Sequence, residues 1–370
     1  MKLKRTITIF GLLLLVIAGM FVVTGEVSAQ IPPPPSPGID NQDCLTCHDI
    51  PDQRMTLPSG EILFITVKGD SYDASVHGMG GYACVQCHTD ITEYPHRELE
   101  ATTLREFTIT MNQSCARCHK EKFDATLDSV HGQALDKGNV EAAVCTDCHG
   151  AHNVGPANEP RTRIPHTCER CHSEIYKRYE HSVHGEALIG EGNPDVPTCI
   201  DCHGVHNVSG PSTSESFHLS SPLLCAECHA DEELMGKYGI STDVFDTYIS
   251  DFHGTTVLFE SEIPGQETNK PVCIDCHGVH DMRMVNDPES SVMKENLLTT
   301  CQKCHPDANA NFPSSWLGHY IPDRNVYPAV FYIETFYKIV IPVMVVGMLI
   351  FVISDFIRRY IIGRKERQHV

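Results

Sequence analysis

The cysteines of this 370-residue chain follow one pattern, in which a pair separated by two residues is followed directly by histidine. Nine such CxxCH motifs use all 18 cysteines: Cys44, Cys47, Cys84, Cys87, Cys115, Cys118, Cys145, Cys148, Cys168, Cys171, Cys199, Cys202, Cys225, Cys228, Cys273, Cys276, Cys301 and Cys304. Two thiols at this spacing can form thioethers to the vinyl groups of one haem, and the histidine can ligate its iron. The pattern therefore predicts nine covalently bound c-type haems.

The histidines that complete the motifs are the predicted proximal ligands, which lie on the cysteine-bound side of each haem. They are His48, His88, His119, His149, His172, His203, His229, His277 and His305. Disulfides in an exported chain and zinc sites built from CxxC pairs are the alternatives. Neither alternative explains why a histidine follows every second cysteine.

The motifs recur in two-haem units that carry a His-Gly pair between the motifs. Three clear units begin at Cys115, Cys168 and Cys225, and in each of them a Gly-x-His segment follows the second motif. A degenerate first unit begins at Cys44, and a closing half unit begins at Cys301. Four and a half units account for nine haems.

This repeat also predicts nine distal ligands, which would complete each iron from the opposite side. The His-Gly positions and the closing half unit supply His77, His131, His184, His253 and His319. The positions after the second motifs supply His96, His152, His206 and His280. The last three of these lie close behind a proximal histidine, so we expect each to reach a neighbouring haem. We assign His166, His181 and His218 to the surface or to contacts around the ligands.

The composition predicts a fold that is mainly α, with much irregular structure and small β-hairpins. Aromatic residues make up 7% of the chain and there is one tryptophan, which leaves little volume for large conventional cores. We therefore expect the haems to form most of the core of a domain spanning residues 44–325. Residues 60–67 and 107–110 alternate like strands.

The N-terminal 29 residues have the features of a signal peptide. Lys2, Lys4 and Arg5 precede an apolar run, and Val27-Ser28-Ala29 suits cleavage before Gln30. The alternative is an uncleaved anchor, because the run is slightly long. Residues 30–43, which contain Ile31-Pro-Pro-Pro-Pro-Ser-Pro-Gly38, read as an extended linker.

Residues 329–357 are predicted to form a transmembrane helix, since Ile339–Ser354 carries no charge. The basic residues that follow place the tail, residues 358–370, in the cytoplasm and the haem domain in the periplasm. A buried core helix is the disfavoured alternative.

The net charge of −20 excludes a nucleic-acid binder that neutralises phosphates. Without the signal and the tail region, 20 basic and 45 acidic residues remain, a net charge of −25. A soluble or extracellular redox partner would then present a basic docking patch. The alternative is that the acidity serves only solubility.

Paired CxxCH motifs around Ser-Val-His-Gly, with Cys-Ile-Asp-Cys-His-Gly-Val-His, resemble the periplasmic multihaem cytochromes c of the doubled-CxxCH class from about Cys44 to His319. The layout from Lys294 through Cys301-Gln-Lys-Cys304-His305 into the transmembrane segment resembles members tethered to the membrane beside a cytochrome b subunit. The resemblance implies electron transfer between the quinone pool and periplasmic acceptors.

We therefore expect an electron conduit, in which nine bis-histidine haems carry electrons from a quinol-oxidising membrane partner to periplasmic or extracellular acceptors. The alternative is a redox enzyme similar to hydroxylamine oxidoreductase, multihaem nitrite reductase or tetrathionate reductase, which needs one iron with a displaceable ligand. A third possibility is a subunit of a cytochrome filament. The equal numbers of proximal and distal candidates favour the conduit.

Overall fold

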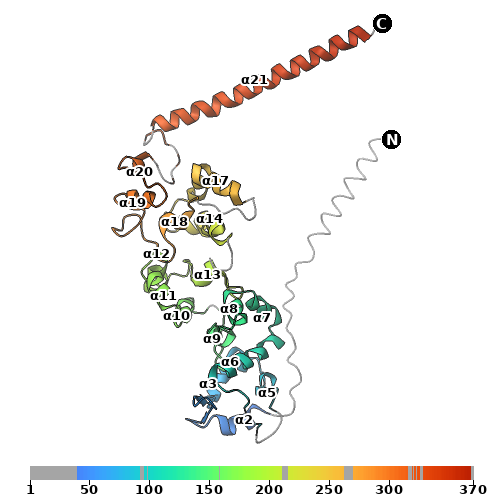
Figure 1. Cartoon of the computed structure of the whole chain (residues 1–370), viewed down its shortest axis with the longest axis vertical. Coiled ribbons are helices and arrows are strands. Elements are labelled where there is room, and N and C mark those ends of the chain that lie inside the picture. Colours follow the sequence, from blue (N-terminus) through green and yellow to red (C-terminus); the bar gives the residue numbers. More distant parts are fainter. Residues whose placement is uncertain are drawn as a thin grey trace. The chain divides into compact units, whose positions relative to one another are not determined.

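The computed structural model describes residues 40–91, 96–97, 99–157, 159–210, 216–261, 270–315, 319, 321, 323–325 and 328–367. It is mainly helical, and most of its helices are short and joined by irregular segments (Figure 1). The predicted signal peptide and most of the predicted linker lie outside the described residues. The chain divides into two compact units, Met1–Ala157 and Asn158–Val370.

The first compact unit contains nine helical segments and one hairpin within its described residues. They are α2 (Asn41–His48), β1 (Arg54–Thr56), β2 (Ile62–Phe64), α3 (Gly69–Asp73), α4 (Val76–Met79), α5 (Cys84–Cys87), α6 (Leu104–Asn112), the 3-10 helix η1 (Gln113–Arg117), α7 (Lys120–Leu127), α8 (Val130–Asp136) and α9 (Cys145–His149).

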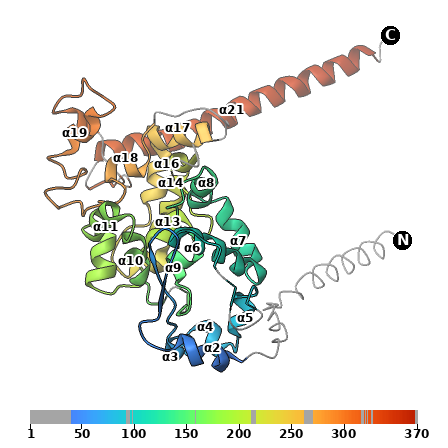
Figure 2. The ribbon, with the colours of Figure 1, turned by 60° about the horizontal axis from the view of Figure 1, so that its bottom comes forward.

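The second compact unit is helical throughout its described elements. They are α10 (Arg163–Glu169), α11 (Ser173–Glu180), α12 (Val183–Gly185), the π-helical turn η2 (Glu186–Gly190), α13 (Cys199–His203), α14 (Ser216–His229), α15 (Glu232–Gly236), α16 (Val244–Ser250), α17 (Phe252–Ser261), α18 (Cys273–His277), α19 (Leu297–Gln302), α20 (Phe312–Ser315) and α21 (Pro328–Arg367). Figure 2 shows the same short helices from a second direction.

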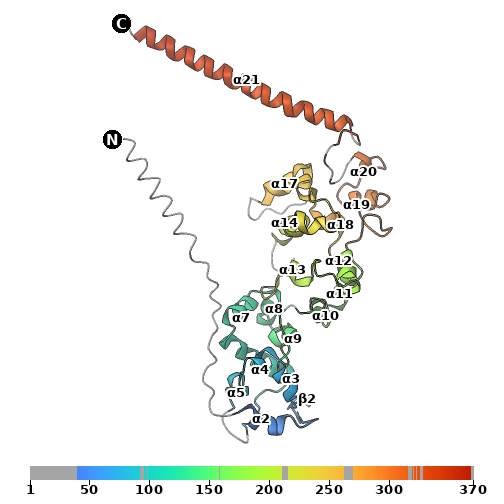
Figure 3. The same ribbon diagram turned by 180° about the vertical axis from the view of Figure 1, so that it is seen from behind.

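One of the two strand predictions is confirmed. β1 and β2 pair antiparallel, with Arg54 opposite Phe64 and Thr56 opposite Ile62; β2 is labelled in Figure 3. Gly60 lies in the connecting turn with a φ of +86°, a conformation that glycine adopts without steric cost.

The strand prediction for residues 107–110 is wrong, because these residues lie inside α6. Thr103 caps this helix by accepting a hydrogen bond from the backbone N–H of Glu106 at 3.1 Å. The Glu106 carboxylate in turn accepts from the backbone N–H of Thr102 at 2.7 Å. These caps stabilise a helix start that the four-residue alternation does not reveal.

Few apolar side chains of the described residues are buried. Fourteen hydrophobic residues form the core, and four of these are alanines: Leu57, Ala83, Val85, Ala101, Ala142, Val144, Tyr176, Tyr179, Leu188, Met235, Tyr248, Val257, Val272 and Ala308. The apolar side chains of Val205 and Val279, each next to a predicted distal histidine, remain about half exposed at 51% and 48%. Protein side chains alone therefore bury little apolar surface around the motifs.

The helix α21 is long and apolar enough to cross a membrane over the 33 residues Pro328–Tyr360, within which an 18-residue window has a mean hydropathy of 2.5. It runs as one helix in Figures 1 to 3 and continues to Arg367. At its start, Lys338 pairs with Glu334 at 2.5 Å, four residues apart. The chain therefore has one C-terminal helix suited to single-pass anchoring.

Truncation before Pro328 should move the mature protein from the membrane pellet to the soluble fraction, because it removes the whole apolar span. A chain that lacks only residues 361–370 is the matched control and should stay in the pellet. Immunoblotting of carbonate-washed membranes measures the distribution. Retention of the longer truncation in the pellet would instead show that the N-terminal segment is an uncleaved anchor.

Candidate functional site

The CxxCH motifs take two local forms. The second motif of each unit makes a short helix of its own, namely α5, α9, α13 and α18. The first motifs, and the closing motif, begin inside helical segments that start upstream of the motif, namely α2, η1, α10, α14 and α19. The proximal histidine is therefore placed at or just beyond a helix end in every motif.

The residue directly before the second cysteine of the second motif caps its own helix. Asp147 accepts a hydrogen bond from the backbone N–H of Val144 at 2.7 Å, and Asp275 accepts one from Val272 at 2.7 Å. In the first unit Gln86 does the same for Ala83 at 2.6 Å. This side chain satisfies an N–H group that the start of the helix leaves without a helical partner.

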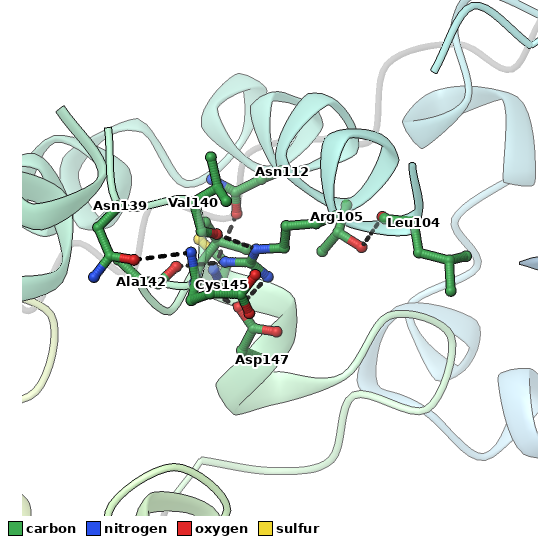
Figure 4. A network of polar contacts seen from close by, with 11 residues as sticks. Leu104, Arg105, Asn112, Asn139, Val140, Ala142, Cys145 and Asp147 are labelled. Carbon is green, nitrogen blue, oxygen red and sulfur yellow. Dashed lines mark hydrogen bonds and ion pairs between the residues drawn. The ribbon is translucent and has the colours of Figure 1, made fainter. Parts of the chain in front are cut away.

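A second residue holds the capping aspartate from outside the motif, as Figure 4 shows for Arg105. The Arg105 guanidinium pairs with Asp147 at 2.9 Å and also donates to the carbonyl oxygens of Val140 and Ala142. Asn112 accepts a hydrogen bond from the backbone N–H of Cys145 at 3.0 Å. These contacts fix α9, and with it the motif, against α6.

Equivalent contacts occur in the third and fourth two-haem units. Arg161 pairs with Asp201 at 2.8 Å, and the Nε2 atom of His218 lies 2.9 Å from Asp275. Arg161 and His218 both lie seven residues before the first cysteine of a motif. His218, which the sequence analysis left without a ligand role, thus occupies a position that supports a motif.

The His-Gly segments share one construction. A serine that is at most 3% exposed precedes three of them, as Ser75, Ser129 and Ser182, and its hydroxyl accepts a hydrogen bond from the glycine N–H. In the fourth, Asp251 accepts from the N–H of Gly254 at 3.0 Å. The cap places the intervening histidine in the first helical turn.

The glycine of this segment is required by a close approach rather than by its φ angle. A Cβ atom on Gly78, Gly185 or Gly254 would collide with the carbonyl oxygen of the tyrosine six residues earlier. The hydroxyls of these tyrosines donate to a carbonyl just before the second motif of the same unit: Tyr72 to Tyr82, Tyr179 to Pro197 and Tyr248 to Pro271. The tyrosine thus joins the His-Gly turn to the second motif.

The sequence analysis missed these tyrosines. The signal was present, because each lies three residues before the capping serine or aspartate in three of the four His-Gly segments. The two-haem unit that begins at Cys115 has Thr126 at the corresponding position, so the tyrosine is not common to all four segments and the pattern was overlooked.

The structure brings predicted proximal and distal histidines together in pairs. Seven pairs have ring centroids 5.9–6.4 Å apart, as the individual values show: His48–His96 at 5.9 Å, His88–His152 at 6.0 Å, His119–His77 at 6.1 Å, His203–His280 at 6.0 Å, His229–His184 at 6.3 Å, His277–His319 at 6.3 Å and His305–His253 at 6.4 Å. The remaining predicted ligands, His131, His149, His172 and His206, also make interactions with other groups.

The pairs follow a simple register. A His-Gly histidine faces the proximal histidine of the first motif in the next unit or half unit, as His77 faces His119 and His253 faces His305. A Gly-x-His histidine faces the second motif of the preceding unit, as His280 faces His203. The closing half unit is therefore not self-contained, since its His319 faces His277.

The spacing of these pairs fits two imidazoles on opposite sides of one metal. With a metal–nitrogen bond of about 2 Å and roughly 1.1 Å from that nitrogen to the ring centre, trans imidazoles have centroids roughly 6.2 Å apart, and tetrahedral ones roughly 5.1 Å. Among the described residues no group of three or more His, Cys, Asp or Glu side chains is placed to hold a metal ion. A planar macrocycle that supplies four further ligands fits the pairs.

At several of these imidazoles burial lowers the pKa and so favours the neutral form, which is the form that binds metal. Burial, followed by the nearby His229, lowers the pKa of His184 to about 4. Burial is also the main cause that lowers the pKa of His88, His152 and His277. The Nδ1 atoms of His48 and His203 lie 2.7 Å and 2.8 Å from backbone carbonyl oxygens, which leaves Nε2 to face the partner ring.

The cysteines show which motifs are neighbours. The first cysteines of the two motifs in each unit lie within hydrogen-bonding distance of each other: Cys44 and Cys84, Cys115 and Cys145, Cys168 and Cys199, and Cys225 and Cys273. Adjacent units approach through other cysteines, since burial and then the nearby Cys115 and Cys118 raise the pKa of Cys87. Within each compact unit, motifs that are consecutive in sequence therefore lie next to each other.

The three histidines without a predicted ligand role lie outside the seven pairs. His166 contacts Glu169 at 3.2 Å and lies against the ring of Tyr176, and His181 is an exposed residue at the end of α11. His218 contacts Asp275, as described above.

Comparison with known proteins adds no relative: no family model and no curated protein matches this chain.

Replacing Gly185 with alanine should lower the thermal unfolding midpoint, because the new Cβ collides with the backbone of Tyr179. We expect a loss of about 1–3 kcal/mol, typical of overpacking at a close contact. Gly190→Ala is the matched control five residues away, where a Cβ meets nothing within 4 Å. Differential scanning calorimetry measures both, and equal midpoints for the two variants would contradict the close approach.

Proposed function

We propose that the protein is a membrane-tethered multihaem cytochrome c that conducts electrons through nine bis-histidine haems. The observation that carries the proposal is the set of seven proximal–distal imidazole pairs at a separation suited to a metal held between them. Each pair includes the histidine of a CxxCH motif, whose cysteines would attach the macrocycle. Bound haem would supply one-electron iron redox chemistry.

The protein's own groups would bind and orient these haems. The capped motif helices would hold the proximal imidazoles, and the Ser/Asp-capped His-Gly turns would hold several of the distal ones. Apolar side chains beside the motifs, including Val205 and Val279, would lie against the macrocycles and exclude water. The small protein core supports this reading, since haems would contribute the missing apolar volume.

The order of the motifs supports conduction along the chain. First cysteines lie together within each unit, and second-motif cysteines such as Cys276 lie near the cysteines of the next motif, Cys301 and Cys304. Haems attached to these sulfurs would be neighbours, so an electron could pass between consecutive motifs without a long step. Two consecutive haems joined by such contacts would form one step of an electron-transfer chain.

The membrane helix supports a position for one end of this haem chain near a membrane donor. His319 lies nine residues before Pro328, and nine residues reach at most about 30–32 Å when fully extended. Because His319 faces His277, the haem of the Cys273 motif would lie close to the bilayer surface. A cytochrome b-type, quinol-oxidising subunit is the donor that the resemblance implies, and the basic tail favours a periplasmic orientation of the haem domain.

At the other end, a soluble or extracellular acceptor would dock against an acidic domain. The net charge of −25 outside the signal and tail regions favours a partner with a basic patch. The enzyme alternative, a catalyst similar to hydroxylamine oxidoreductase or the multihaem nitrite and tetrathionate reductases, needs one iron with an open site. The experiment below distinguishes it.

The purified protein should carry nine haems by intact mass, and its reduced form should bind almost no carbon monoxide, because every iron has two histidine ligands. Absorbance in the Soret region before and after carbon monoxide addition measures this. Binding by one haem per chain would contradict the conduit and favour the enzyme. Fewer than nine haem additions would show that some motifs are not attachment sites.

Replacing His184 with methionine should leave the haem count at nine but raise the potential of one haem, because His/Met ligation lies above bis-histidine ligation. His181→Met is the matched control, three residues away and outside the pairs. Spectroelectrochemical titration measures the potentials. A shift in the His181 variant and none in the His184 variant would show that the wrong histidine has been assigned.

A further inference from the structure

The seven histidine pairs divide into two groups by the angle between their rings. Four pairs are nearly parallel: His277–His319 at 17°, His88–His152 at 19°, His203–His280 at 21° and His48–His96 at 23°. Three are strongly tilted: His253–His305 at 48°, His184–His229 at 52° and His77–His119 at 60°. None of the seven angles lies between the groups.

The division follows the backbone that presents the distal histidine. All three tilted pairs use a His-Gly histidine, held in the first turn of α4, α12 or α17. The cap of Ser75, Ser182 or Asp251 and the close approach of the glycine fix the direction of that turn. The four parallel pairs use distal histidines outside these turns, namely His96, His152, His280 and His319.

We propose that the His-Gly turn creates a second class of bis-histidine haem, interleaved with a first class along the chain. This inference rests on the proposed function, since it assumes that iron is bound between the paired rings. In the second compact unit the classes alternate over four consecutive motifs: His203 parallel, His229 tilted, His277 parallel and His305 tilted.

The ring angle has a defined electronic consequence. Each imidazole donates π density perpendicular to its own plane into the iron d orbitals. Parallel rings act on the same d orbital and separate it in energy from its partner, whereas strongly tilted rings act on both and leave them close together. In the low-spin ferric state, parallel pairs therefore give a rhombic electron paramagnetic resonance signal. Tilted pairs give a more anisotropic signal whose largest g value is higher.

The test is low-temperature electron paramagnetic resonance of the ferric, haem-loaded, full-length protein and of three variants. His184→Ala and His253→Ala should each remove one haem equivalent from the high-g signal, convert that haem to high-spin iron and leave the rhombic signal unchanged. His280→Ala is the matched control and should remove one equivalent from the rhombic signal only. Covalent attachment through the cysteines keeps the haem count at nine in each variant, which denaturing haem staining checks.

A single signal class in the wild type, or loss from the same signal in all three variants, would overturn the inference while leaving bis-histidine ligation intact. A wild-type spectrum dominated by high-spin iron would overturn the proposed function itself, and this inference with it. Since two variants probe the tilted class, failure of one to fold still leaves the class testable.

Discussion

The constraint on which this structure depends is the approach of two imidazoles from different parts of the chain to about the same separation, seven times over. His184 and His229 come from consecutive units, and so do His203 and His280. In six of the seven pairs the two histidines come from different two-haem units, so in these pairs neither ring can be placed by its own unit alone. Within each compact unit, consecutive two-haem units must therefore fold against each other, and a backbone hydrogen bond in the second compact unit reflects this, since the N–H of Val183 donates to the carbonyl of Met282 at 2.9 Å.

The small side chains around the histidines serve this constraint. A buried serine cap contributes about 1 kcal/mol to a helix start, which is little compared with the cost of ordering a loop. The main effect of the cap is to fix the direction of the His-Gly turn. The backbone has one path, because Gly185 lies between the hydroxyl of Ser182, to which its N–H donates, and the carbonyl of Tyr179. The tyrosine hydroxyl then connects that turn to the next motif at 2.7 Å. The turns that carry the proposed ligands are thus held mainly by hydrogen bonds between side-chain hydroxyls and backbone groups.

Much of this could be predicted from the sequence. The CxxCH motifs, the candidate distal histidines and the apolar helix near the C-terminus follow from residue types and spacing, and the helix is confirmed. Which histidines face each other could not be predicted, because the register depends on contacts between units. His319 illustrates the point: its position in the closing half unit suggests the Cys301 motif, yet the structure places it against His277. The strand predicted at 107–110 failed for a local reason, the capping of α6 by Thr103.

The central claim is that paired histidines are the two axial ligands of every haem. Near-infrared magnetic circular dichroism of the ferric protein tests it most directly, because the charge-transfer band in this region reports the pair of axial ligands on low-spin iron. The account predicts a band of bis-histidine type with an intensity equal to nine haems per chain. A bis-histidine band with less than the intensity of nine haems, accompanied by a His/Met band or by high-spin iron, would contradict the account.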